Sequence, residues 1–189
     1  MIAIAIGIEL FDTAIGRCGI AWSERGVVGV QLPEVDASAT QVLLARRFPG
    51  AAQRLPPAEV VDAIAAITAL LRGEADDTPS IVLDTNAVPP FERSVFEACR
   101  RIAAGSTLTY GELARQIGAP GAARAVGRAL GRNPYAPVVP CHRVLAAGGR
   151  PGGFSAHGGL ATKLRLLEIE GAPGFGAGSL FGSASRDTE

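Results

Sequence analysis

The chain has 189 residues, 48% of them hydrophobic, and its 18 Lys and Arg residues balance its 18 Asp and Glu residues. This length is enough for one domain with a large core or for two small ones. No apolar run is long enough to span a bilayer, so we expect a soluble globular protein without a membrane partner. The three cysteines, Cys18, Cys99 and Cys141, are widely spaced and suit a reducing cytoplasm better than a disulfide framework.

The zero net charge hides an uneven distribution along the chain. Residues 1–87 carry 6 basic and 11 acidic side chains, a net of −5, whereas residues 88–172 carry 11 and 5, a net of +6. Residues 173–189 carry 1 basic and 2 acidic side chains. A basic segment joined to an acidic one indicates that the basic segment faces a polyanion, although chance segregation of charge would give the same counts.

Residues 1–87 are predicted to form a small α/β domain. Residues 2–8 are apolar but short and lack a basic leader, which favours a strand over a signal peptide. Residues 17–22 and 27–32 follow as two more strands, joined by a turn of hairpin length. Three further elements complete the segment: a helix over 38–48 capped by Ser38, a helix over 57–73 and a short strand over 81–83.

A second domain is predicted over residues 88–172, beginning at Pro89-Pro90. Its first helix carries Cys99 on an apolar stripe, so this cysteine is expected in the core. Thr109-Tyr110-Gly111-Glu112 then has the form of a capping box, which opens a short helix that ends at Gly118. A next helix is predicted from Pro120 to Gly131, and two short helices with a tight joint are typical of a helix-turn-helix.

The second of these helices is unusual because small side chains surround a single long cation, Arg124. Small side chains let a helix approach another surface closely. On duplex DNA this is typical of a wedge rather than of a helix that reads bases, which carries several polar side chains. The alternative is tight packing against another helix, with Arg124 solvated.

The sequence Pro140-Cys141-His142-Arg143-Val144 contains the strongest chemical signal. A working cysteine needs a base or a positive charge beside it, because only a few per cent of an ordinary thiol is ionised near neutral pH. His142 can reach Cys141 only if the backbone turns sharply, and Pro140 favours such a turn. The alternative is a buried structural cysteine next to a surface histidine.

Residues 148–159 are glycine-rich and are predicted to form a loop. The helix that follows has Leu160, Leu164 and Leu167 at helical spacing and ends at Glu170. A carboxylate at the C-terminus of a helix meets the unfavourable end of the helix dipole, so we interpret Glu170 as held there for a partner. The Gly- and Ser-rich tail over 173–189 is predicted to be disordered.

Residues 91–172 resemble the O6-alkylguanine-DNA alkyltransferases, also called methylated-DNA–protein-cysteine methyltransferases. The Pro-Cys-His-Arg-Val sequence is the hallmark of that family, and Asn133-Pro134, the Ala-Arg-Ala-Val-Gly run around Arg124 and Tyr110 stand at the spacing found in the family. The resemblance implies a mixed α/β fold, with a ribonuclease-H-like N-terminal domain and a winged-helix-like C-terminal domain that carries the helix-turn-helix and the cysteine. It also implies repair of duplex DNA by irreversible transfer of one alkyl group from O6-alkylguanine, and in some cases O4-alkylthymine, after base flipping from the minor groove.

The resemblance assigns a role to individual residues. Cys141 would accept the alkyl group, His142 would activate it through a water, and Glu170 would orient the histidine. Asn133 would hold the turn, and Tyr110 would assist the departing base. The residues implied in DNA contact are Arg124, Ala123, Ala122, Tyr110 and Arg132, and those implied in the base pocket are Tyr110, Val144, Phe154, Ser155 and Gly158.

Two features depart from the family pattern. Phe154 stands where the family often has Tyr, and Ala156-His157 adds two residues that some members lack. The N-terminal segment offers one cysteine and no histidine, so we expect no structural zinc, no other metal and no cofactor.

Three other functions compete with alkyl transfer. Alkyltransferase-like proteins flag damaged bases without repair, but they lack the acceptor cysteine. A helix-turn-helix regulator would make no use of the Cys-His turn. A Cys-His hydrolase would need an oxyanion hole and repeated turnover. We therefore expect a monomeric, cytoplasmic alkyltransferase that reacts once.

Overall fold

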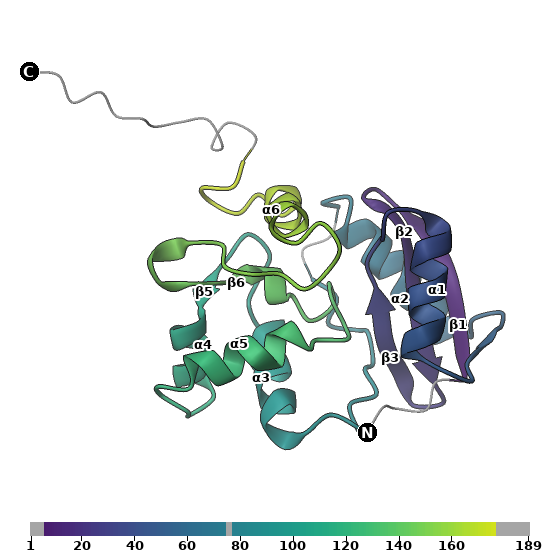
Figure 1. Ribbon diagram of the computed structural model, residues 1–189, viewed down its shortest axis with the longest axis horizontal. Coiled ribbons are helices and arrows are strands. Elements are labelled where there is room, and N and C mark those ends of the chain that lie inside the picture. The colour runs from purple at the N-terminus through teal and green to yellow at the C-terminus, as the bar shows by residue number, and fades with distance from the viewer. Residues whose placement is uncertain (1–5, 75–76, 177–189) are drawn as a thin grey trace, which may run out of the picture.

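The computed structural model describes residues 6–74 and 77–176. It has a mixed α/β architecture in which a four-stranded sheet with two helices forms one half and a group of helices forms the other (Figure 1). The start of the strand predicted over 2–8 and the part of the tail from residue 177 on lie outside the described residues.

The sheet is a three-stranded antiparallel meander with one short parallel strand at its edge. Its strands are β1 (Gly7–Thr13), β2 (Gly16–Ser23), β3 (Gly26–Gln31) and β4 (Ala52–Gln53), in the order β3-β2-β1-β4. The meander is therefore confirmed, but its first strand is Gly7–Thr13 and not residues 2–8 as predicted, and β4 was not predicted. The predicted strand over 81–83 is wrong, because this segment meets β3 only where Val27 N donates to Val82 O and Asp84 N donates to Val27 O.

Helices α1 (Ala37–Arg47) and α2 (Ala58–Leu70) cover opposite faces of the sheet. Helix α1 is capped by Asp36, whose Oδ1 accepts from Ala39 N at 2.7 Å, and not by Ser38 as predicted. It approaches the sheet closely because β3 carries Gly29 there. A Cβ on Gly29 would clash with the ring of Phe48.

The second half is helical, with one small sheet. Its elements are α3 (Pro90–Arg100), β5 (Leu108–Thr109), α4 (Tyr110–Gln116), α5 (Ala123–Gly131), a 3-10 turn (Cys141–Arg143), β6 (Val144–Leu145), a second 3-10 turn (Ala147–Gly149) and α6 (Leu160–Ile169). The predicted capping box is confirmed, since the Glu112 carboxylate accepts from Thr109 N at 2.6 Å and Glu112 N donates to Thr109 Oγ1. Helix α5 begins at Ala123 rather than Pro120, because Gly121 adopts a φ of +88° that interrupts the helix.

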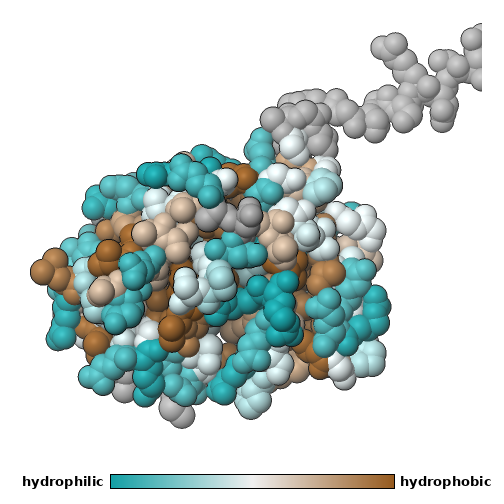
Figure 2. Space-filling model, turned by 180° about the vertical axis from the view of Figure 1, so that it is seen from behind, coloured by the Kyte–Doolittle hydropathy of each residue, from teal (hydrophilic) through white to brown (hydrophobic). Residues whose placement is uncertain are grey.

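One hydrophobic core runs through both halves. It joins Ile20 and Trp22 of the sheet to Val95 and Cys99 of α3, so the predicted core position of Cys99 is confirmed. Tyr135 closes the junction, because its hydroxyl donates to the Asp84 carbonyl at 2.8 Å. On the face opposite to that of Figure 1, hydrophobic residues are scattered among hydrophilic ones (Figure 2). Within the described residues, no helix combines the length and the apolar character needed to cross a membrane.

Candidate active site

Cys141 begins the 3-10 turn that connects Pro140 to β6, so the sharp turn expected here is confirmed. Asn133, which follows α5, holds the segment that precedes Cys141. Its Nδ2 donates to the Val139 carbonyl at 2.8 Å and its Oδ1 accepts from Tyr135 N at 2.9 Å. Because the Cys141 amide also donates to the Val139 carbonyl, at 2.8 Å, the backbone that presents the thiol is fixed from both sides.

His142 is fully buried and pairs with Glu170 at the end of α6. The distance from its Nε2 to Glu170 Oε1 is 2.7 Å. The other ring nitrogen, Nδ1, has no hydrogen-bond partner among the described residues, and no hydrogen bond joins the ring to the Cys141 thiol. Burial lowers the pKa of His142, although the Glu170 carboxylate opposes this shift. The imidazole is therefore neutral near neutral pH, and donation from Nε2 to Glu170 leaves Nδ1 as a proton acceptor.

Arg143 shares the same carboxylate. Its Nε donates to Glu170 Oε2 and its Nη2 donates to Glu170 Oε1, each at 2.9 Å. Its Nη1 donates to Asp77 Oδ1 at 2.8 Å and also to the Ile102 carbonyl. Burial alone would raise the pKa of Glu170, but the hydrogen bonds from His142 and Arg143 outweigh it and the net pKa is lowered. Glu170 is thus ionised, and both of its carboxylate oxygens accept hydrogen bonds. The partner expected for it consists of His142 and Arg143 of the same chain.

The thiol of Cys141 is protonated in this environment. Burial raises its pKa, while contact with the Asn133 amide and the charge of Lys163 lower it by less. A thiol with a raised pKa needs a base at the moment of reaction. His142 is the next residue in the 3-10 turn. Its ring is neutral, and its Nδ1 can accept the proton of the thiol.

Lys163 is a functional candidate that the sequence did not indicate. Its ammonium donates to the Val144 carbonyl at 2.6 Å and lies 6.0 Å from the centre of the Tyr110 ring. Burial lowers its pKa to about 8, and a negative charge on the nearby Cys141 or Cys99 would oppose this shift.

The buried face of α6 differs from the leucine spacing expected for this helix. It consists of Lys163, Leu166 and Leu167, whereas Leu160 is 47% exposed. The sequence signal that could have indicated a buried Lys163 is its position three and four residues before the buried leucines Leu166 and Leu167.

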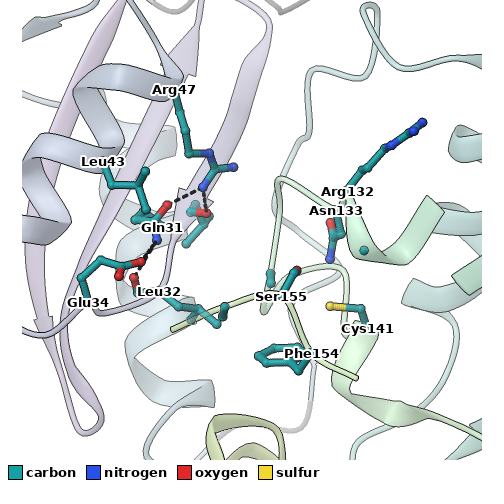
Figure 3. Close-up of a pocket in the computed structure, with 14 residues that line it drawn as sticks. Gln31, Leu32, Glu34, Leu43, Arg47, Arg132, Asn133, Cys141, Phe154 and Ser155 are labelled. Atoms are coloured by element: carbon teal, nitrogen blue, oxygen red, sulfur yellow. Dashed lines mark hydrogen bonds between the residues drawn. The ribbon is translucent and has the colours of Figure 1, made fainter. Parts of the chain in front are cut away.

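Two hollows meet at Cys141. One, of about 370 Å³, is lined by Tyr110, Gly127, Leu130, Gly131, Cys141, Gly153, Phe154 and Ser155. The other, of about 280 Å³, lies between the two halves of the protein (Figure 3) and is lined by Val30, Gln31, Leu32, Glu34, Leu43, Arg47, Gly131, Arg132, Asn133, Ala136, Cys141, Phe154, Ser155 and Ala156. Of the predicted pocket residues, Tyr110, Phe154 and Ser155 line the first hollow. Val144 is fully buried, and neither Val144 nor Gly158 lines either hollow.

Of the predicted DNA-contacting residues, Ala122, Ala123, Arg124 and Arg132 lie in or next to α5, whereas Tyr110 begins α4 and lines the first hollow. Arg124 is exposed, with Ala122 and Ala123 half-buried beside it. Arg132 is exposed at the end of α5 and forms an ion pair with Glu92 at 3.3 Å. In the described part of the chain, no three His, Cys, Asp or Glu side chains are grouped closely enough to hold a metal ion.

Residues 90–172 match the family model described as 6-O-methylguanine DNA methyltransferase, DNA binding domain. The chain is 47% identical over 109 residues to the methylated-DNA–protein-cysteine methyltransferase of Mycobacterium leprae, an alignment that covers 58% of this chain and 64% of that protein. It is 56% identical over 80 residues to the protein of the same name from Mycolicibacterium paratuberculosis, covering 42% and 47%. The matched region thus spans about half to two thirds of these curated relatives.

Two crystal structures resemble the chain over most of its length. The O6-methylguanine methyltransferase of Mycobacterium tuberculosis is 33% identical with a TM-score of 0.69, and the match covers 87% of this chain and 92% of that one. The structure of Mycobacterium tuberculosis OGT in complex with DNA is 32% identical with a TM-score of 0.68, covering 93% and 98%.

Proposed function

Because the chain belongs to the O6-methylguanine DNA methyltransferase family, we propose that it repairs alkylated DNA by moving an alkyl group from O6 of guanine to Cys141. O4-alkylthymine is a second candidate substrate. The observation that carries the proposal is the buried Cys141 thiol at the meeting point of two hollows, with a neutral His142 held by Glu170 behind it.

The proposed reaction is a single displacement. His142, through a bridging water, takes the thiol proton, and the sulfur attacks the alkyl carbon. The S–C bond forms as the C–O6 bond breaks, and the electron pair stays on O6. The departing guanine then gains one proton, with Tyr110 hydrogen-bonding or protonating it. Since a thioether does not hydrolyse, each molecule reacts once, and no cofactor is required.

We further propose that duplex DNA is bound through its minor groove by α5, with the damaged nucleotide flipped out of the stack. An alkyl carbon at the edge of a stacked base is out of reach of a buried thiol, and extruding the base costs a few kcal/mol. Small side chains at Ala122 and Ala123 permit close approach, and the exposed Arg124 would fill the gap left by the base. Arg132 would contact the phosphates.

The finer architecture is also a proposal. We assign residues 1–87 to a ribonuclease-H-like domain and 88–172 to a winged-helix-like alkyltransferase domain. The meander with its flanking helices supports the first assignment, and the helix-turn-helix with the small β5–β6 sheet supports the second. A location in the cytoplasm fits three thiols that are all free and buried, and we propose that the protein acts as a monomer.

Intact mass measurement tests the function directly. The protein is mixed with an excess of duplex DNA carrying one O6-methylguanine, and the product is then digested for peptide mapping. We expect a gain of one methylene per protein, located on Cys141 and absent in Cys141→Ala. Tight binding of the lesion without a gain in mass would support the flagging function instead, and repeated release of product would support a hydrolase.

A further inference from the structure

The added residues Ala156 and His157 have no role in the site described above. They directly follow a segment, residues 151–155, whose Phe154 and Ser155 line both hollows at Cys141 (Figure 3). His157 Nδ1 lies 3.4 Å from Oε2 of Glu34, which belongs to the N-terminal half. This ion pair therefore joins the wall of the site to the other half of the protein.

The segment 151–155 has little else to hold it in place. In the part of the chain that the structure describes, its backbone forms no hydrogen bond with any other residue. The neighbouring backbone bonds lie outside it, where Ala146 N donates to the Arg150 carbonyl at 2.8 Å and Gly159 N donates to the Ala156 carbonyl at 2.9 Å. Phe154 is half-buried against the main core. A segment with so few bonds opens at a low cost in free energy, so the contacts at its ends decide how often it is closed.

Beyond His157 the chain enters α6 through two glycines. Gly158 and Gly159 have φ angles of +77° and +52°, a conformation that suits glycine. The Thr162 hydroxyl donates to the His157 carbonyl at 2.6 Å. This bond ties the backbone of His157 to the first turn of α6, and its ring extends to the N-terminal half.

Glu34 is held in place before it meets the histidine. Its backbone N donates to Thr40 Oγ1 at 3.0 Å, and its Oε1 accepts from Gln31 Nε2, also at 3.0 Å. The second oxygen, Oε2, faces His157. The Glu34 side chain is only 18% exposed, whereas that of His157 is 51% exposed. Because Glu34 is already ordered, the ion pair costs little further side-chain entropy.

Two other charged or polar neighbours must be considered around the imidazole. A small hollow of about 130 Å³ lies beside His157, and its charged lining residues are Glu34 and Arg165 of α6. Arg165 opposes a positive charge on the ring, but its Nη2 donates to the Ala14 carbonyl at 3.1 Å, in the turn between β1 and β2. Glu34 favours the charge and contacts the ring directly. The remaining lining residues are uncharged: Ile15, Pro33, Thr162 and Leu166.

We propose that His157 is a positioning residue, whose ion pair with Glu34 holds the segment 151–155 over the site and so keeps Phe154 and Ser155 beside Cys141. Its effect on alkyl transfer rests on the proposed function, whereas its effect on the segment does not. The pair requires a charged imidazole, and histidine ordinarily changes charge between pH 5 and 8. The hold on the segment therefore weakens as pH rises through this range.

Limited proteolysis measures the position of the segment directly. Chymotrypsin can cleave after Phe154 only when residues 151–155 have moved away from the core, and at low protease concentration the cleavage rate follows the population of the open form. The variants are His157→Gln, Glu34→Gln and the two combined, with the fragments identified by mass. Glu24→Gln is the matched control, because Glu24 is an exposed carboxylate in the turn between β2 and β3.

An ion pair with a half-exposed partner is expected to change the cleavage rate by about two- to fivefold. At pH 6 cleavage after Phe154 should therefore be faster by this factor in each single variant, no faster in the combined variant and unchanged in Glu24→Gln. At pH 8 the single variants should approach the unaltered protein. His157→Lys keeps a positive charge and should protect the segment at both pH values. Each comparison is made at one pH, so the pH dependence of the protease cancels.

Alkyl transfer provides the second readout. The substrate is the free base O6-methylguanine, which has no phosphate that the charge of residue 157 could attract. We expect His157→Gln to lower the transfer rate about twofold at pH 6 and to leave it unchanged at pH 8, and His157→Lys to restore it at pH 6. Because the proteins are compared at the same pH, the titration of Cys141 and His142 cancels.

Several results would overturn the inference. They are an unchanged cleavage rate in either single variant, additive effects in the combined variant, an unchanged transfer rate at pH 6, or an equal rise in cleavage after the buried Tyr135, which would report a general loss of stability. Absence of methyl transfer by the unaltered protein, from the free base and from duplex DNA, would instead overturn the proposed function. The cleavage rates would then still decide whether His157 holds the segment.

Discussion

Replacing Lys163 with Met is expected to change how the free energy of unfolding depends on pH. Burial lowers the pKa of Lys163 from its ordinary value of 10.5 to about 8. Below pH 8 Lys163 is charged in both states, but its charge is less favourable in the native protein than in the unfolded chain. This difference lowers the free energy of unfolding by about 3 kcal/mol. Between pH 8 and 10.5 the unfolded chain binds more protons than the native state, so the cost shrinks as pH rises.

Met retains most of the length of Lys but cannot titrate. It also loses the bond from Nζ to the Val144 carbonyl, which leaves a buried acceptor unpaired at a cost of roughly 1–3 kcal/mol at every pH. Urea unfolding of both proteins at pH 7, 8 and 9, with a reductant present, separates the two effects. Between pH 7 and 9 the unaltered protein should gain roughly 1 kcal/mol relative to Lys163→Met.

The cysteines titrate in both proteins, so to first order they cancel in this comparison. A difference between the two unfolding free energies that stays constant from pH 7 to 9 would refute the reasoning. It would mean that the pKa of Lys163 is not lowered in the native state, because its charge is as well solvated there as in the unfolded chain.

Other predictions concern Glu170, helix α5 and the sheet. Glu170→Gln removes the buried charge that holds Arg143 and should lower the unfolding free energy by about 3–5 kcal/mol in urea titration; a loss below 1 kcal/mol would contradict the network. Arg124→Ala, at an exposed position, should change stability by less than about 0.5 kcal/mol yet slow alkyl transfer from duplex DNA more than from the free modified base. Equal effects on both substrates would show that Arg124 does not act on the duplex. Gly29→Ala should cost about 1–3 kcal/mol by overpacking against Phe48, and unchanged thermal unfolding would indicate that the ring moves aside.

Much of the C-terminal half could be predicted because its signals are local. A capping box satisfies amides within one turn of α4, and the apolar stripe of α3 repeats at helical spacing, so a short window of sequence contains the cause of each. The start of α5 was misplaced because the left-handed Gly121 overrides the usual preference for Pro at the first turn.

The site was only partly predictable, because its remaining contacts are long-range. Asp77 reaches Arg143 across 66 positions of sequence, and Arg47 reaches Pro134 across 87. Neither pair has a local pattern. Lys163 was missed because a lysine is rarely buried, and only the packing around it provides a carbonyl and an aromatic face for its ammonium.

The shared core has a consequence for how the molecule comes apart. Val95 and Cys99 of α3 pack in the same cluster as Ile20 and Trp22 of the sheet, so neither half has a complete interior of its own. Heating should therefore melt the described chain in one calorimetric transition, with equal van't Hoff and calorimetric enthalpies. A fragment that starts at residue 88 would expose these α3 side chains to water, and it should be recovered as an aggregate rather than as a small DNA-binding domain.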